Sequence, residues 1–158
     1  MVTDEDPAKI MAREDYAMFS EEGRERIRFQ VEFSHAALRN LQLVNGGALI
    51  ALLTFLGNSD ASFDFRGLWW AFFWFGSGLV SSLAAYFGAF FSQHFYMIQT
   101  FGEAWNAQHK ARGLDEPNGD TLYHFRLGNI ALATGIVLAT CSLVFFVAGA
   151  FVALFALR

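Results

Sequence analysis

The chain has 158 residues, a formal net charge of -4, and contents of 54% hydrophobic and 17% aromatic residues. This length fits one domain, but the apolar and aromatic content is too high for an ordinary soluble fold of that size. The basic residues of the amino-terminal segment are balanced by nine acids. This balance argues against nucleic-acid binding, which favours a basic patch.

Asp, Glu, Lys and Arg are absent from three long runs, residues 40–59, 67–102 and 127–157. A helix of about 20 apolar residues crosses the roughly 30 Å hydrocarbon core of a bilayer, so each run is long enough. The sequence therefore predicts an all-α integral membrane protein with three transmembrane helices. We place the spans at about residues 40–57, 67–93 and 128–156.

The segment before the first span is predicted to be helical as well. Asp6 and Pro7 are typical of a helix start, and we expect residues 1–20 to form an amphipathic helix in the cytoplasm or at the membrane interface. Ser20, followed by two glutamates, is typical of a second helix start. We therefore expect residues 21–158 to form the three-span domain.

The two later helices are also expected to have cytoplasmic extensions. The second helix should run from near Arg66 to near Arg112, which is longer than a bilayer requires. A turn follows it, marked by Gly113, Pro117 and Asn118-Gly119, and Asp120 or Thr121 caps the third helix. The first helix should end at residues 57–60, which are rich in turn formers.

The basic residues predict an orientation. Nine of the 11 lysines and arginines lie before the first span or between the second and third, and only Arg66 and Arg158 lie on the other side. Positive charge is retained in the cytoplasm, so we expect the amino terminus there and the carboxyl terminus outside. The bacterial inner membrane is the expected location.

Small residues form the clearest pattern within the spans. On the third span they recur every seven positions, at Gly128, Gly135, Ser142 and Gly149, and the second span has a counterpart in Gly78, Ser82 and Ala85. Small residues let helix backbones approach in lipid, and a seven-residue period favours left-handed packing. These stripes either pack the three helices within one chain or face another subunit.

Polar residues near the inner side of the membrane are the other candidates, chiefly Asn45, Gln42 and His94. An amide in lipid needs a partner, so Asn45 and Gln42 are interpreted as hydrogen-bonding glue between helices or as the lining of a wet vestibule. His94 could approach His35 to form a metal or proton site, but no metal-binding spacing occurs. We expect no catalytic residue, cofactor or metal.

These observations favour a non-catalytic membrane protein that acts by assembly, as an accessory or scaffold subunit or as a homo-oligomer. Its expected partners are the lipid bilayer and either further copies or a larger membrane complex. A homo-oligomeric pore, including a membrane-permeabilising effector, is the alternative, with Asn45 and Gln42 or the third-span stripe as its lining. A membrane enzyme that uses His94 and Glu103 is a third hypothesis. Buried carboxylates and broken helices are absent, which disfavours proton-coupled carriers and inverted-repeat transporters.

Overall fold

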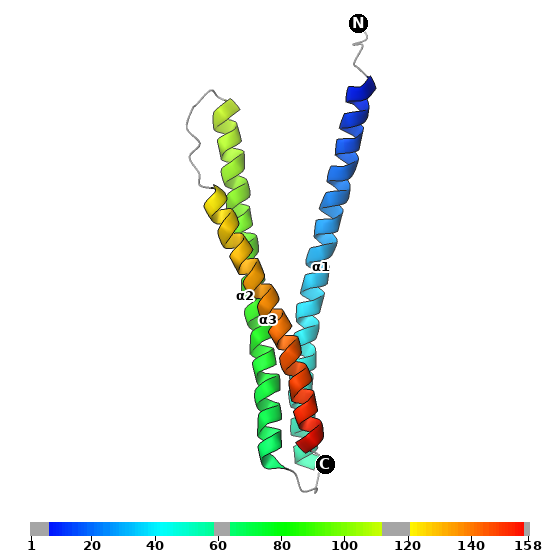
Figure 1. The fold of residues 1–158 in the computed structure, drawn as a ribbon, viewed down its shortest axis with the longest axis vertical. Coiled ribbons are helices and arrows are strands. Elements are labelled where there is room, and N and C mark those ends of the chain that lie inside the picture. The colour runs from blue at the N-terminus through cyan, green and yellow to red at the C-terminus, as the bar shows by residue number, and fades with distance from the viewer. Residues whose placement is uncertain (1–6, 59–63, 112–120, 157–158) are drawn as a thin grey trace. The chain divides into compact units, whose positions relative to one another are not determined.

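The computed structural model describes residues 7–58, 64–111 and 121–156, and all of its regular elements are helices (Figure 1). They are α1 (Pro7–Asn58), α2 (Phe65–Ala111) and α3 (Thr121–Ala156). All three helices are long and apolar enough to cross a membrane, over Ile27–Asn58, Phe65–Lys110 and Thr121–Ala156. The chain is thus an all-α protein with three candidate membrane spans, as the sequence predicts, and this indicates an integral membrane protein.

The chain divides into two compact units, Met1–Ala37 and Leu38–Arg158. The first unit is the amino-terminal part of α1. Its helix runs through Ser20, where the sequence suggested a second helix start. A serine lowers helix stability by only about a few tenths of a kcal/mol relative to better helix formers. The helix-forming residues on both sides outweigh this cost. Asp6 and the predicted turn at residues 112–120 lie outside the described residues.

Within the first unit, the described side chains are exposed and mix apolar with charged residues. Ile27, Phe29 and Phe33 are all exposed. Arg28 and Glu32 form an ion pair one turn apart, with 3.9 Å between Nε and Oε1. A pair this exposed contributes little to stability. This segment therefore presents both apolar and charged side chains to its surroundings.

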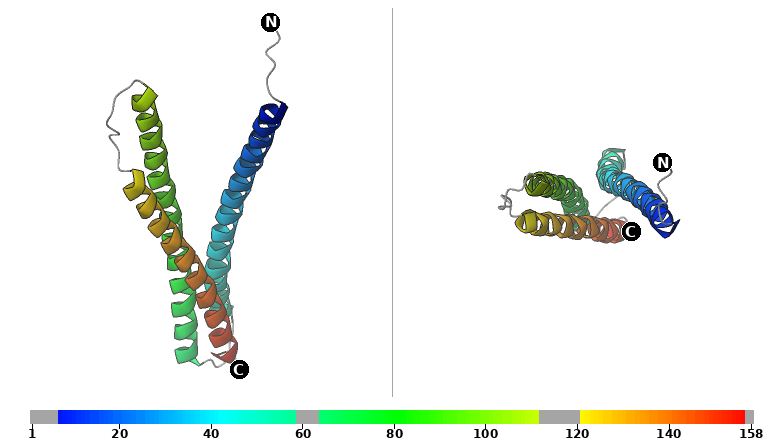
Figure 2. Two further views of the ribbon diagram at one scale, coloured as in Figure 1. Left: turned by 45° about the horizontal axis from the view of Figure 1, so that its top comes forward. Right: turned by 90° about the horizontal axis from the view of Figure 1, so that it is seen from above.

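The second unit contains the membrane half of α1 together with α2 and α3. The antiparallel helices α2 and α3 lie side by side (Figures 1 and 2). A hydrophobic cluster near the start of α2 and the end of α3 joins all three helices, and its buried members are Leu52, Leu68, Ala71, Phe75, Ala153 and Ala156. The core of this unit thus lies at the end where α1 and α3 finish and α2 begins.

Asp64 fixes the start of α2. Its carboxylate Oδ1 accepts a hydrogen bond from the backbone N–H of Arg66 at 3.1 Å, and its carbonyl accepts one from Leu68 at 3.0 Å. Its own N–H donates to the carbonyl of Ala156 at 3.4 Å. Asp64 is therefore the N-cap of α2 and also ties that helix to the end of α3.

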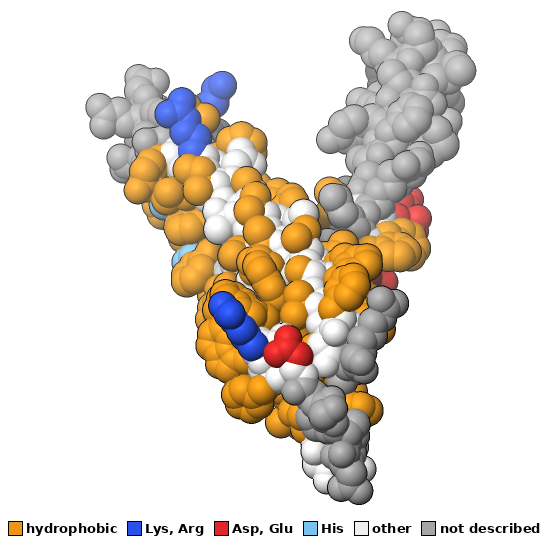
Figure 3. Space-filling view, turned by 60° about the horizontal axis from the view of Figure 1, so that its bottom comes forward, with side chains coloured by type: hydrophobic (Ala, Val, Ile, Leu, Met, Phe, Trp, Pro, Cys, Tyr) orange, Lys and Arg blue, Asp and Glu red, His pale blue; other side chains and the backbone are white. Residues whose placement is uncertain are grey.

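Large apolar side chains cover most of the described surface on the face in Figure 3. Trp69, Trp70 and Phe73 form an exposed aromatic cluster near the start of α2, with ring centroids 5.2 to 5.9 Å apart. Such rings suit the membrane interface. Two other phenylalanines, Phe72 and Phe146, are partly buried and pack against the hydrophobic cluster.

Candidate functional site

The small-residue stripe of α3 is buried against α2. Gly128, Gly135, Ser142 and Gly149 are all buried, and so are Gly78, Ser82 and Ala85 on α2. Neighbouring atoms identify the partner. Gly149 faces the ring of Phe75, Gly135 faces the backbone of Ala85 and Gly88, and Gly128 faces the ring of Tyr96. These contacts of the stripe are thus made within one chain. We call this contact the α2–α3 seam.

The two backbones lie close together at Gly88 and Gly135. A methyl group at Gly88 would lie 2.9 Å from the Cα of Gly135 and 3.1 Å from the carbonyl oxygen of Ala131. Real side chains avoid separations below 3 Å, and backbone atoms of a packed helix cannot easily move away. Glycine is therefore required at position 88 if the two helices are to keep this separation.

A polar node joins all three helices in the middle of this packing. Asn45 of α1 is fully buried, and its Nδ2 donates to the Ser142 hydroxyl at 3.2 Å and to the carbonyl of Leu41 at 2.9 Å. The Ser142 hydroxyl donates in turn to the carbonyl of Gly78 at 2.7 Å. One short chain of hydrogen bonds therefore runs from α1 through α3 to α2.

The remaining polar atom of the node has no such bond. Asn45 Oδ1 is buried and has no hydrogen-bond partner among the described residues. It lies against Gly78, where a Cβ would overlap it and would stand 2.7 Å from Asn45 Cγ. A glycine Cα–H is a weak donor, so this close contact compensates only part of the cost of burying the oxygen.

A second polar contact between α2 and α3 lies near the start of α3. The Tyr96 hydroxyl donates to Oδ1 of Asn129 at 2.6 Å, which joins α2 to α3. The ring of Tyr96 lies over Gly128, where a Cβ would stand 2.6 Å from it. Because Gly128 has no side chain, the ring of Tyr96 can lie against α3. In this position the hydroxyl of Tyr96 reaches the side-chain amide of Asn129.

Sequence reasoning did not pair these residues. The seven-residue spacing identifies Ser142 only as a small residue, and none of the patterns considered includes Asn129. Asn129 is the one amide side chain in the charge-free run 127–157, which is a usable signal, because an amide in a span needs a partner. Gln42 is half-buried, and no hydrogen bond of its side chain is found among the described residues.

The histidines do not form a metal site in the described part of the chain. His94 is exposed, and its ring stacks on Phe90 with the centroids 6.3 Å apart. Glu103 accepts a hydrogen bond from Gln99 at 2.8 Å, and His109 packs against Trp105. No group of three or more metal-ligating side chains occurs among the described residues. The approach of His35 to His94 stays a prediction.

The fold and the seam define a class, a helical membrane protein whose spans pack through small residues and a few buried polar groups. Comparison with known proteins adds no family to this description. No family model, no curated protein and no solved structure matches the chain. Its function is therefore argued from the packing of its helices.

Proposed function

We propose that this protein is a non-catalytic membrane protein that acts by assembly, as an accessory or scaffold subunit or as a homo-oligomer. The supporting observation is that some of its glycines have no neighbouring helix packed against them among the described residues. Gly46 and Gly47 of α1 and Gly76 of α2 have no described side chain or neighbouring helix within 4 Å of the position that a Cβ would occupy.

Such open glycines contrast with those of the seam. Gly78, Gly88 and Gly128 each leave room for a named neighbour, and a Cβ at any of them would clash. Glycine lowers helix stability by up to about 1 kcal/mol relative to alanine. A glycine with no neighbouring helix among the described residues is explained if a helix of another subunit packs against it.

Charge placement supports an orientation for this assembly. We propose that the amino terminus lies in the cytoplasm and the carboxyl terminus outside the bacterial inner membrane, because nine of 11 basic residues flank the inner side of the spans. On this basis the exposed Ile27, Phe29 and Phe33 lie near the cytoplasmic entry to the membrane, where a partner subunit can reach them.

The experiment compares two glycine-to-leucine variants. Gly47→Leu places a side chain in open space, so the chain should fold but assemble less well. Gly88→Leu places one against the backbone of α3, so it should destabilise the chain itself. Assembly is read from the mass of the protein in nanodiscs, and folding from resistance to unfolding. Unchanged mass in Gly47→Leu would remove the α1 face from the proposal.

A flux assay tests the pore alternative. Two candidate pore linings are buried within the chain. Asn45 lies between the helices, and the small-residue stripe of α3 packs against α2. Acting by assembly requires no conducting path, so purified protein in liposomes should pass no ions. Measurable flux that changes with Gln42→Leu would favour the pore.

A further inference from the structure

The polar node fixes the depth of Arg39, an exposed residue of α1. The hydrogen bonds from Asn45 to Ser142 and from Ser142 to the Gly78 carbonyl place these three residues at about the same depth in the membrane. Arg39 precedes Asn45 along α1 and lies at most about 9 Å from this depth, at 1.5 Å of rise per residue.

The other two helices stay apolar well beyond the depth of Arg39. On the same side of the node, α2 has no charged residue as far as Gly102 and α3 has none as far as Leu127. These charge-free stretches extend about 36 Å beyond Gly78 and about 22 Å beyond Ser142. They expose large apolar side chains at Phe90, Phe91, Ile130 and Leu132. Because such side chains need lipid around them, the hydrocarbon core extends past the depth of Arg39.

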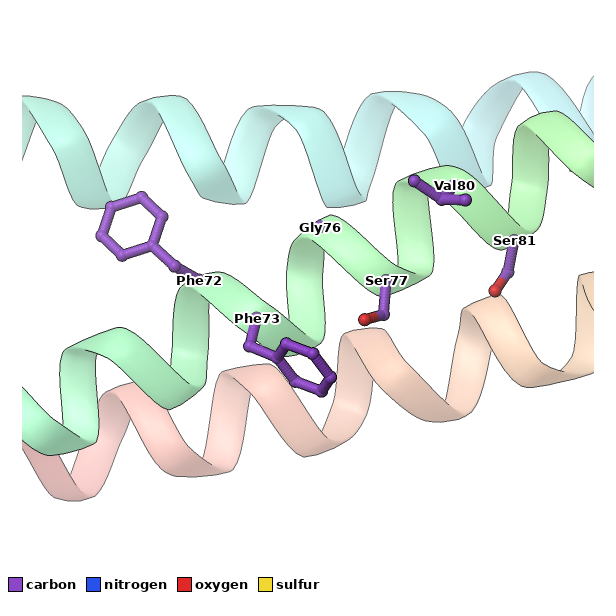
Figure 4. A pocket seen from close by; sticks show the side chains of 6 residues that line it. All are labelled: Phe72, Phe73, Gly76, Ser77, Val80 and Ser81. Carbon is purple, nitrogen blue, oxygen red and sulfur yellow. The ribbon is translucent and has the colours of Figure 1, made fainter.

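Arg39 also lies on a lipid-facing side of α1. Leu43 and Ile50 follow it at the spacing of residues that share a helix face, and they are 61% and 66% exposed. Grooves elsewhere on the described spans carry no charge. The one on α2 is lined by Phe72, Phe73, Gly76, Ser77, Val80 and Ser81 (Figure 4). Arg39 is therefore a charged side chain on a surface that otherwise suits acyl chains.

The described part of the chain supplies no counter-ion for Arg39. The guanidinium forms no ion pair or hydrogen bond among the described residues. The nearest described acid on α1 is Glu32, which pairs with Arg28, and the facing stretches of α2 and α3 are free of charge. A charged group in hydrocarbon is costly, so a long arginine side chain extends toward the headgroups, where phosphate is the available anion.

We infer that Arg39 binds the phosphate of a phospholipid, in the leaflet on the amino-terminal side of the first span. The planar guanidinium donates parallel N–H bonds to two phosphate oxygens. Because Arg39 lies below the level at which α2 and α3 remain apolar, it draws this headgroup toward the bilayer centre. The bilayer is then thinner beside α1 than beside the α2–α3 pair. This inference concerns a lipid site and does not depend on assembly.

Retained lipid tests the inference. The protein is extracted from native membranes in a detergent without phosphate, and its bound phospholipid is counted by native mass spectrometry. Arg39→Gln should lower the retained lipid at least several-fold, and Arg39→Lys should lower it less, because lysine keeps a point charge. The matched control is Arg126→Gln, an exposed arginine just beyond the charge-free run of α3. Equal losses in Arg39→Gln and Arg126→Gln would overturn the inference.

Solid-state NMR tests the contact itself. Arginine labelled with ¹³C at Cζ should show dephasing by lipid ³¹P in bilayers, and part of this signal should vanish in Arg39→Gln. Dephasing that is the same in both proteins would overturn the inference. So would displacement of the bound lipid by an equal concentration of inorganic phosphate, which would identify a site for soluble anions. A smaller assembly with unchanged lipid in Arg39→Gln would instead assign Arg39 to a subunit contact and overturn the lipid site.

Discussion

The side-chain amide of Asn45 lies against the backbone of Gly78. Its Nδ2 donates a hydrogen bond to the Ser142 hydroxyl, and its Oδ1 contacts the glycine without a hydrogen bond. The contact joins the membrane half of α1 to the α2–α3 pair. A buried asparagine at a helix interface commonly fixes register, because any other alignment leaves its amide without partners. We interpret Asn45 as the residue that sets the alignment of α1 within the second unit.

The first prediction concerns Gly78→Ala. Its Cβ would overlap the Asn45 amide, so α1 should shift and the free energy of unfolding should fall by about 1–3 kcal/mol. Asn45→Ala in the same chain should restore part of this loss, because it removes the clash. The measurement is a double-mutant cycle from unfolding in detergent mixtures. Gly46→Ala, at an open position, serves as the control. Additive losses would show that the two residues are not coupled.

The second prediction concerns the hydrogen bonds of the node. Ser142→Ala removes its bond to the Gly78 carbonyl and the acceptor for Asn45, and should cost about 0.6–1.7 kcal/mol. Thr140→Ala, two residues away, removes only a bond to the carbonyl of its own helix and should be close to neutral. The comparison is again of free energies of unfolding. Equal effects of the two variants would contradict the assigned role of Ser142.

Much of the fold could be predicted from the sequence, and the reason is the bilayer. A charge-free run long enough to span lipid must be helical, because the helix is the conformation in which a single segment forms all of its own backbone hydrogen bonds. The helix ends near Asn58, Phe65, Ala111 and Thr121 accordingly lie close to the expected boundaries. The continuity of α1 through Ser20 could not be predicted in this way, because that segment lies outside the charge-free runs.

The candidate site was less predictable, because periodicity gives a face but not its partner. The seven-residue spacing of α3 identifies residues that share a side, but it does not pair Ser142 with Asn45 or Tyr96 with Asn129. Those pairs depend on the relative sliding of two helices, which a single sequence does not encode in its local pattern. The charge pattern predicts that α2 begins near Arg66, and it does not identify Asp64 as the N-cap of that helix.

The third prediction concerns the close backbone contact between Gly88 and Gly135 in the α2–α3 seam. Gly88→Ala should destabilise the chain by about 1–3 kcal/mol, because the new methyl group meets backbone atoms of Gly135 and Ala131. Gly57→Ala, where nothing lies within 4 Å, should be neutral or stabilising. Thermal unfolding of the two variants in the same detergent measures the difference. A neutral Gly88→Ala would mean that the helices are farther apart than the structure places them.

The fourth prediction compares the two parts of the Tyr96 contact. Tyr96→Phe loses only the hydroxyl bond to Asn129, and should cost about 0.6 kcal/mol, the average for such bonds in membranes. Gly128→Ala should cost more, because its Cβ displaces the whole ring and with it the bond. Unfolding free energies of both variants check the order. A larger effect of Tyr96→Phe would assign the stability of this contact to the hydrogen bond.

The central claim is that the open small-residue faces serve assembly, and the mass of the intact protein in nanodiscs tests it most directly. The measurement is native mass spectrometry, with every co-purifying protein identified in the same sample. We expect a single defined assembly, either a closed homo-oligomer or a stoichiometric complex with another membrane protein. A strict monomer with no co-purifying partner, at protein concentrations where the chain remains folded, would contradict the account.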